Sequence, residues 1–289
     1  MRLTRALALS DDGLLVLVGK HDTRATLLDR SGAEPKTLAG KRIGAASMVA
    51  LLGDGTLALH ARVLFDRAGK PLTKAVFGYR SAFAARGELV IAVEDETLRR
   101  MDRDGEVVQT VVLPQVAERL AVAADVDACV VGLRAILDES EGDAVGRITI
   151  FEGERAKTVN VLDEYEVNSV AMSRDGSRIA AGGYIASDGP VGGIRLFRRG
   201  VMEDVVLPFA PPTSGNGIAF SSNGARIAAI VDGNLVRITD LDDTARFWEL
   251  SVGDKGVWCI RAHDGRIEGN GKHGVTGTAA SGVLADALG

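Results

Sequence analysis

The side chains that most often bind metals or act as nucleophiles are few in this sequence. Its four histidines are His21, His60, His263 and His273, and none lies in a metal-ligand spacing such as H-x-E or H-E-x-x-H. Cys259 and His263 are close in sequence, but a strand followed by a turn would direct them to different places. These spacings predict hydrogen-bonded or solvated histidines, with no catalytic residue, no metal site and no cofactor.

The cysteines and the densest group of carboxylates also fit roles in the fold and its surface better than roles in catalysis or metal binding. Cys129 and Cys259 lie in apolar, strand-like runs, which predicts two buried free thiols and a reducing compartment. The acidic residues of 138–143 (DESEGD) offer oxygen ligands for Ca²⁺. Their spacing does not match a calcium-binding loop, so we expect a solvated loop tip.

Motifs for nucleophilic attack and phosphate binding are absent from the sequence. It contains neither a G-x-S-x-G elbow nor a Walker-type glycine loop. The pairs Gly182-Gly183 and Gly192-Gly193 surround a long loop. We interpret them as glycines at a hairpin tip, because no helix N-terminus follows them to bind a phosphate.

Composition limits the class of protein. The 289 residues are 46% hydrophobic and 25% charged, which is ordinary for a folded domain, and the 35 glycines suggest many turns between short strands. A net charge of −5 argues against a general nucleic-acid binder. No apolar run approaches the roughly 18 residues of a membrane span, and the apolar stretch near the N-terminus is short for a signal peptide. We expect a cytoplasmic protein with no membrane partner, and an excess of Arg over Lys suggests a bacterial source.

A repeated turn motif organises the chain. Residues 173–181 read SRDGSRIAA and residues 221–229, which begin 48 positions later, read SSNGARIAA. Asp-Gly and Asn-Gly between apolar runs are strong hairpin signals, because both residues tolerate positive φ. Weaker copies bring the number to seven and begin at Asp11, Gly53, Ala85, Asp125 and His263.

A second family of turns alternates with the first. It begins at Asp29, Asp66, Asp102, Glu152, Arg198, Asp240 and Asp286, again seven times. Two hairpin turns in each unit of roughly 40–45 residues are typical of the four-stranded blade of a β-propeller. The sequence therefore predicts one all-β domain, a seven-bladed β-propeller. Its expected blades are residues 5–38, 46–76, 82–113, 119–161, 168–207, 217–250 and 256–289.

These turns resemble those of the WD-repeat type of β-propeller. The likeness lies in the Ser-x-Asp-Gly turn after an apolar strand and in the Asp that ends the third strand of a unit. The Gly-His and Trp-Asp dipeptides of that family are absent, and Leu28, Phe65, Phe151 or Phe197 stands in place of its third-strand Trp. The resemblance implies the fold and no particular function. A six-bladed propeller of the NHL-like or lactonase-like type is the alternative.

The last unit ends near its second turn. The segment between Val283 and Asp286 matches a third strand, so we expect a last blade of three strands, or one in which Met1 to Leu3 supplies a minimal fourth. An open strand edge there would allow pairing with another chain. The alternative is a solvated, glycine-rich edge.

The expected strand order assigns the loops to two faces. We label the four expected strands of each blade a to d in chain order, so the first turn family joins a to b and the second joins c to d. Both turn families lie on one face of the propeller. The longer loops, which join b to c and the d of one blade to the a of the next, lie on the other face. Binding residues are often found on loops that a rigid scaffold carries, and Tyr and Arg are frequent at binding hot spots. The residues predicted to bind a partner on this face are Lys41, Arg42, Tyr79, Arg80, Arg119, Tyr165, Tyr184 and Asn216.

We therefore expect a non-catalytic scaffold that binds a protein partner in a bacterial complex. One alternative is a lactonase-like or hydrolase-like propeller with a metal in its channel. The positions that would hold such a metal carry Ala, Val, Gly or Ile, which argues against it. The other alternative is a small-ligand or sugar-binding propeller, which the aromatic content of 4% disfavours.

Overall fold

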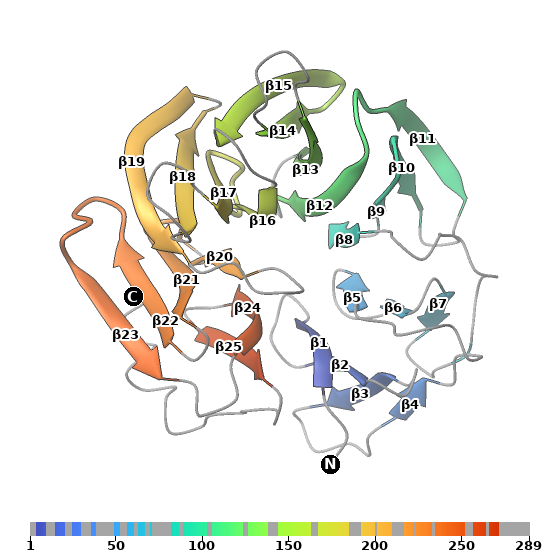
Figure 1. The fold of residues 1–289 in the computed structure, drawn as a ribbon. Coiled ribbons are helices and arrows are strands. Elements are labelled where there is room, and N and C mark those ends of the chain that lie inside the picture. Colours follow the sequence, from blue (N-terminus) through green and yellow to red (C-terminus); the bar gives the residue numbers. More distant parts are fainter. Residues whose placement is uncertain are drawn as a thin grey trace.

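Antiparallel strands make up the fold (Figure 1). The computed structural model describes residues 4–9, 15–20, 25–29, 36–38, 49–52, 57–60, 63–66, 70, 82–86, 89–102, 106–123, 127–137, 144–162, 167–184, 192–199, 201–209, 217–221, 223–232, 235–251, 257–263 and 266–271. Within these ranges the strands form seven antiparallel sheets, and helices do not occur. The same ranges hold no helix of the length and apolarity that crossing a membrane requires.

The strands follow one another along the chain within every sheet. The first three sheets contain β1 (Thr4–Leu9), β2 (Leu15–Lys20), β3 (Ala25–Asp29) and β4 (Lys36–Leu38); β5 (Val49–Leu52), β6 (Leu57–His60) and β7 (Val63–Asp66); and β8 (Ala82–Arg86), β9 (Leu89–Glu94), β10 (Thr97–Met101) and β11 (Val107–Val112). The next two contain β12 (Ala117–Val122), β13 (Ala128–Leu137), β14 (Ala144–Glu152) and β15 (Arg155–Leu162); and β16 (Val167–Met172), β17 (Arg178–Tyr184), β18 (Gly192–Arg198) and β19 (Val201–Phe209). The last two contain β20 (Ile218–Phe220), β21 (Arg226–Asp232), β22 (Leu235–Asp240) and β23 (Phe247–Ser251); and β24 (Val257–His263) and β25 (Arg266–Gly271).

The sheets are arranged around a common centre, with the first strand of each sheet innermost (Figure 1). Each of these inner strands contacts the inner strand of the next sheet, and β24 contacts β1. The inner strands are β1, β5, β8, β12, β16, β20 and β24. The molecule is thus an all-β protein with a propeller-like arrangement.

Apolar side chains point alternately to the two faces of the strands. They build a hydrophobic core between each pair of neighbouring sheets from β8 to β23. On β13, Cys129 and Val131 pack in a cluster with residues of the preceding sheet, whereas Val130 packs in a cluster with residues of the following sheet. Successive strand residues point to opposite faces, so one apolar strand contributes to two clusters. Phe151 and Phe197, at the third-strand positions that resemble the WD-repeat Trp, are both buried.

In the three sheets from β12 to β23, the turns between strands a and b and those between strands c and d lie on one face, as predicted. In three consecutive sheets an N–H of the c–d turn donates to a carbonyl of the a–b turn: Gly153 to Asp127 at 2.7 Å, Arg199 to Ser177 at 2.8 Å, and Leu241 to Ala225 at 2.9 Å. We call this the turn face.

The b–c connection between β9 and β10 and the d–a connection between β11 and β12 meet on the opposite face, which we call the loop face. Leu113 N–H and Ala117 N–H, at the two ends of the connection from β11 to β12, donate to the carbonyls of Glu96 (2.8 Å) and Asp95 (2.7 Å). Asp95 and Glu96 form the turn between β9 and β10, and Asp95 has a φ of 49°.

Candidate binding surface on the loop face

Hydrogen bonds join the starts of three neighbouring inner strands on the loop face. Nε of Arg119, near the start of β12, donates to the carbonyl of Asn168 on β16 at 2.7 Å. The N–H of Gly217, which precedes β20, donates to Oγ of Ser169 on β16 at 3.0 Å. Ser169 is fully buried, so this pair is shielded from water. These two bonds hold three sheets in register around the centre.

Four of the seven inner strands, β1, β12, β16 and β24, share an irregularity at the same place, whereas the pairings of β5, β8 and β20 are regular. The pairing of β12 with β13 shifts between Ala117 and Arg119, and the pairing of β16 with β17 shifts between Val167 and Ser169. β1 and β24 have corresponding shifts after Thr4 and after Val257. Such bulges bend a strand and redirect a side chain, and they are frequent beside functional sites. The residues at the four shifts are Arg5, Glu118, Asn168 and Trp258.

Gln115 lies in the connection between β11 and β12, next to this region. It is 6% exposed, and neither atom of its amide has a hydrogen-bond partner among the described residues. A buried polar group without a partner costs free energy. The backbone around Gln115 is nevertheless fixed, because Leu113 and Ala117 bond to the β9–β10 turn on either side.

The structure describes the side chain of only one residue predicted to bind a partner, Arg119. We predicted Arg119 in a loop, but it lies in β12. The pairing of Ala117 with Leu133 makes this strand begin before Arg119. Tyr184 is the last residue of β17, paired with Gly192. The other predicted residues lie outside the described ranges: Lys41, Arg42, Tyr79, Arg80, Tyr165 and Asn216.

Asn168 and Ser169 were missed, although the sequence carried a signal for the first. Asn168 precedes Asn216 by 48 positions, the same offset that relates the two clearest turns, so the two asparagines occupy equivalent positions in the sequence repeat. The interpretation of Gly182, Gly183, Gly192 and Gly193 as tip glycines was wrong. They are strand residues, because β17 and β18 stay paired as far as Tyr184 and Gly192.

On the turn face the polar side chains mostly satisfy one another. Oγ of Ser173 donates to Oδ1 of Asp175 at 2.7 Å and accepts from the N–H of Arg178 at 2.9 Å. Ser177 donates to the same Oδ1 through both its N–H (3.0 Å) and its Oγ (2.9 Å). These bonds, first of all the one from Ser173, lower the pKa of Asp175 below its usual value.

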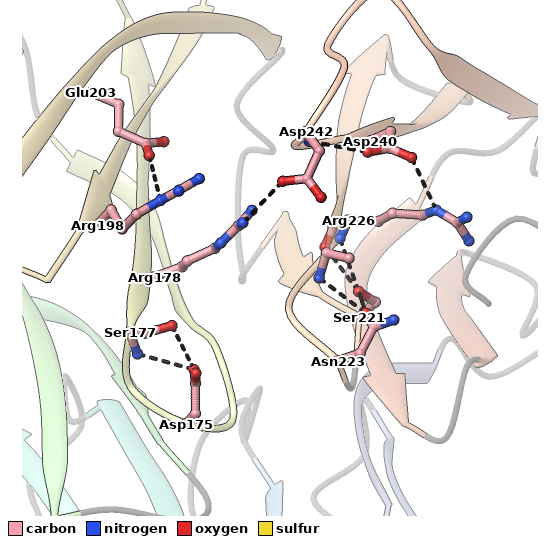
Figure 2. Close-up of polar contacts among 11 residues, drawn as sticks. Asp175, Ser177, Arg178, Arg198, Glu203, Ser221, Asn223, Arg226, Asp240 and Asp242 are labelled. Carbon is pink, nitrogen blue, oxygen red and sulfur yellow. Dashed lines mark hydrogen bonds and ion pairs between the residues drawn. The ribbon is translucent and has the colours of Figure 1, made fainter.

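The second copy of this turn is built in the same way (Figure 2). Oγ of Ser221 donates to Oδ1 of Asn223 at 2.7 Å, and the N–H of Arg226 donates to Ser221 Oγ at 3.0 Å. Gly176 and Gly224 adopt φ values of 72° and 68°, the left-handed conformation that these turns require.

Two ion pairs connect neighbouring sheets on the turn face. Nη2 of Arg178 lies 3.4 Å from Oδ1 of Asp242, in the β22–β23 turn of the next sheet (Figure 2). Nη1 of Arg100 on β10 lies 3.0 Å from Oδ2 of Asp127, in the β12–β13 turn. Beside Arg100, burial raises the pKa of the Cys129 thiol to about 12. Cys129 is a buried free thiol, as predicted.

No group of three or more His, Cys, Asp or Glu side chains within reach of one metal ion occurs in the part of the chain that the structure describes. The described part of the loop face offers hydrogen-bonding and charged groups from Arg119, Asn168 and the carboxylates of the β9–β10 turn.

Comparison with known proteins places the fold. The sequence matches no protein-family description and no curated protein. A solved structure of hydrazine synthase from Kuenenia stuttgartiensis is similar, with a TM-score of 0.73 and 12% identity over 93% of each chain. At this identity the likeness concerns the fold alone. The chain is therefore an all-β protein with the propeller-like architecture of that structure.

Proposed function

We propose that this protein is a closed, seven-bladed β-propeller that binds a protein partner on its loop face and performs no catalysis. The contacts of each inner strand with the next, including that of β24 with β1, support closure. A closed ring of sheets protects the strand edges at its centre and makes a rigid carrier for loops.

The repeated bulge at the start of the inner strands is the observation that carries the proposal. It recurs on β1, β12, β16 and β24, all at the loop-face end. A bulge costs ladder hydrogen bonds, so its repetition at one end indicates that this end presents side chains outward. On the turn face, by contrast, the polar side chains of the two clearest turns, 173–178 and 221–226, bond to groups of the same turn.

The predicted binding residues are consistent with this surface in their sequence positions. In the sequence, Tyr79 and Arg80 come shortly before β8, Tyr165 comes shortly before β16, and Asn216 comes shortly before β20. Residues before neighbouring inner strands converge at one end of a closed ring. Tyr and Arg there would supply the large, hydrogen-bonding contacts that dominate protein interfaces.

Affinity purification with mass spectrometry from the source cells tests the proposal. We expect the tagged protein to retain a defined partner, and we expect Tyr79→Ala, Arg80→Ala and Tyr165→Ala together to abolish retention. The matched control carries Glu154→Ala, Arg174→Ala and Thr244→Ala, three exposed positions in turns of the turn face. The proposal fails if no partner is retained, or if the control loses the partner and the loop-face variant keeps it.

A further inference from the structure

Glycines accompany the bulges of the inner strands. Each of the four bulges lies opposite two residues of the second strand of its sheet, and at least one of these two residues is Gly in every case. The second strands of the three sheets whose inner strand pairs regularly, β6, β9 and β21, contain no Gly. Gly within a strand often marks a bulge or the close approach of another backbone. The glycines opposite the bulges are Gly19, Gly132, Gly182, Gly183 and Gly271.

A bulge changes the direction of the side chains on either side of it. Ala117, before the bulge of β12, packs in the core shared with the preceding sheet, whereas Arg119, after the bulge, donates to β16 of the following sheet. Residues two apart on a regular strand point to the same face, so the bulge is what separates these two directions. β16 repeats the arrangement. Val167 packs in the core with the preceding sheet, and Ser169 accepts a hydrogen bond from the residue before β20.

Gly132 leaves the space in which the bulge of β12 meets the next inner strand. It pairs with Arg119, and a Cβ at position 132 would lie 3.0 Å from Cβ of Arg119, 3.1 Å from Cγ1 of Val167 and 3.3 Å from Cγ1 of Val170. Directly paired residues usually keep their Cβ atoms about 4.5–5.5 Å apart. The valine side chains can yield, but Cβ of Arg119 moves only with the backbone of β12. A side chain at position 132 would therefore displace the start of β12.

We propose that Gly132 is a positioning residue of the candidate binding surface, because it fixes the place of Arg119 on the loop face. This inference rests on the proposed function, in which the loop face binds a protein partner. Arg119 is partly exposed, and its Nε is held 2.7 Å from the carbonyl of Asn168. A side chain that is already held in one place loses little conformational entropy when a partner contacts it, and this favours binding.

A double-mutant cycle in the free protein tests the positioning of Arg119. We expect Gly132→Ala to lower the urea midpoint of unfolding, and Arg119→Ala to lower it as well, because the bond to Asn168 is lost. In the Gly132→Ala background, Arg119→Ala should cause little further loss, since the displaced arginine no longer makes that bond. Additive losses would overturn the positioning role, whatever the protein binds.

Arg119→Gly provides a second test, which also serves if Gly132→Ala alone fails to fold. This substitution removes the Cβ atom that would lie 3.0 Å from the methyl group added at position 132. We therefore expect Gly132→Ala to lower the urea midpoint less in the Arg119→Gly background than in the wild type. If Gly132→Ala is equally harmful in both backgrounds, crowding against Arg119 is not its cause, and the proposal is wrong.

The affinity for the partner that the tagged protein retains tests the role of Gly132 in binding. We expect Gly132→Ala to raise the dissociation constant about tenfold, and Arg119→Ala to raise it in the wild type but hardly in the Gly132→Ala background. The matched control is Ser221→Ala, which removes a buried hydroxyl on the turn face and should leave the affinity unchanged.

The outcomes separate this inference from the proposed function. If Gly132→Ala binds the partner as tightly as the wild type, or if the control loses as much affinity, the role of Gly132 in binding is overturned and the proposed function stands. If the wild type retains no partner, the proposed function fails, and the role of Gly132 in binding fails with it.

Discussion

Arg100 and Asp127 connect two neighbouring sheets through a side chain that is almost completely buried. The guanidinium on β10 lies 3.0 Å from the carboxylate in the β12–β13 turn, and its second nitrogen lies 3.5 Å from the carbonyl of Gly153. Arg100 is 8% exposed, whereas the Asp127 side chain is 44% exposed. Water can solvate the carboxylate of Asp127 but not the buried guanidinium of Arg100. The arginine therefore needs the ion pair more than the aspartate does.

This asymmetry predicts which substitution is more harmful. Asp127→Ala leaves a buried guanidinium without its counter-charge and should lower the free energy of unfolding by about 2 kcal/mol. Arg100→Met leaves only a half-exposed carboxylate, which water can solvate, and should cost less. In a double-mutant cycle the combined variant should lose less than the two single losses added. Urea denaturation measures all three, and additive losses would show that the two residues are not coupled.

The buried serine that begins each copy of the repeated turn should contribute more to stability than the less buried Ser177 near the end of the first copy. Ser221→Ala removes a buried hydroxyl that both donates to Asn223 and accepts from Arg226, and it should destabilise the protein by about 1–2 kcal/mol. Ser177→Ala removes a more exposed bond to Asp175 and should cost less than about 0.5 kcal/mol. Chemical denaturation distinguishes the two, and equal losses would contradict the assigned role of the buried hydroxyl.

Asp175 should make its turn sensitive to acid. Its pKa is lower in the folded protein than the unfolded value of about 3.9, chiefly because Ser173 donates to it. Its stabilisation is therefore complete above the unfolded pKa and is lost as pH falls through the folded pKa. Asp175→Asn should flatten the dependence of stability on pH below about 4, and Asn223→Asp in the second turn should steepen it.

Denaturant midpoints at pH 6 and pH 3 provide the comparison for this prediction. The Asn223→Asp variant is the matched control, because it places a carboxyl in a turn of the same geometry. If both variants follow the acid dependence of the wild type, the carboxylate does not contribute through these bonds.

The local turns could be predicted from the sequence, whereas contacts between sheets could not. Asp-Gly and Asn-Gly specify the turns at Asp175 and Asn223 through nearby residues alone. The position of Arg119 inside β12 depends on pairing with β13. The pair of Arg100 and Asp127 depends on how two sheets pack, since the residues are 27 positions apart and lie in unrelated motifs. Strand order alone predicted which face carries the candidate surface. The roles of Asn168 and Ser169 in joining the inner strands there became visible only in the structure.

The Cys129 thiol should be unreactive in the folded protein. Burial raises its pKa to about 12, so almost none is thiolate at pH 8, and the side chain is inaccessible. In a Cys259→Ser variant, a thiol-specific reagent should label Cys129 only after denaturant unfolds the protein. Rapid, complete labelling without denaturant would contradict the buried position between the sheets.

Hydrogen–deuterium exchange of the purified complex with its partner tests the central claim most directly, because it locates the bound surface. We predict slower exchange in peptides that cover residues 113–119 and 167–169, on the loop face. Peptides that cover residues 173–178 and 221–226, on the turn face, should exchange as in the free protein. Protection confined to the turn-face peptides, or no protection on the loop face, would contradict the account.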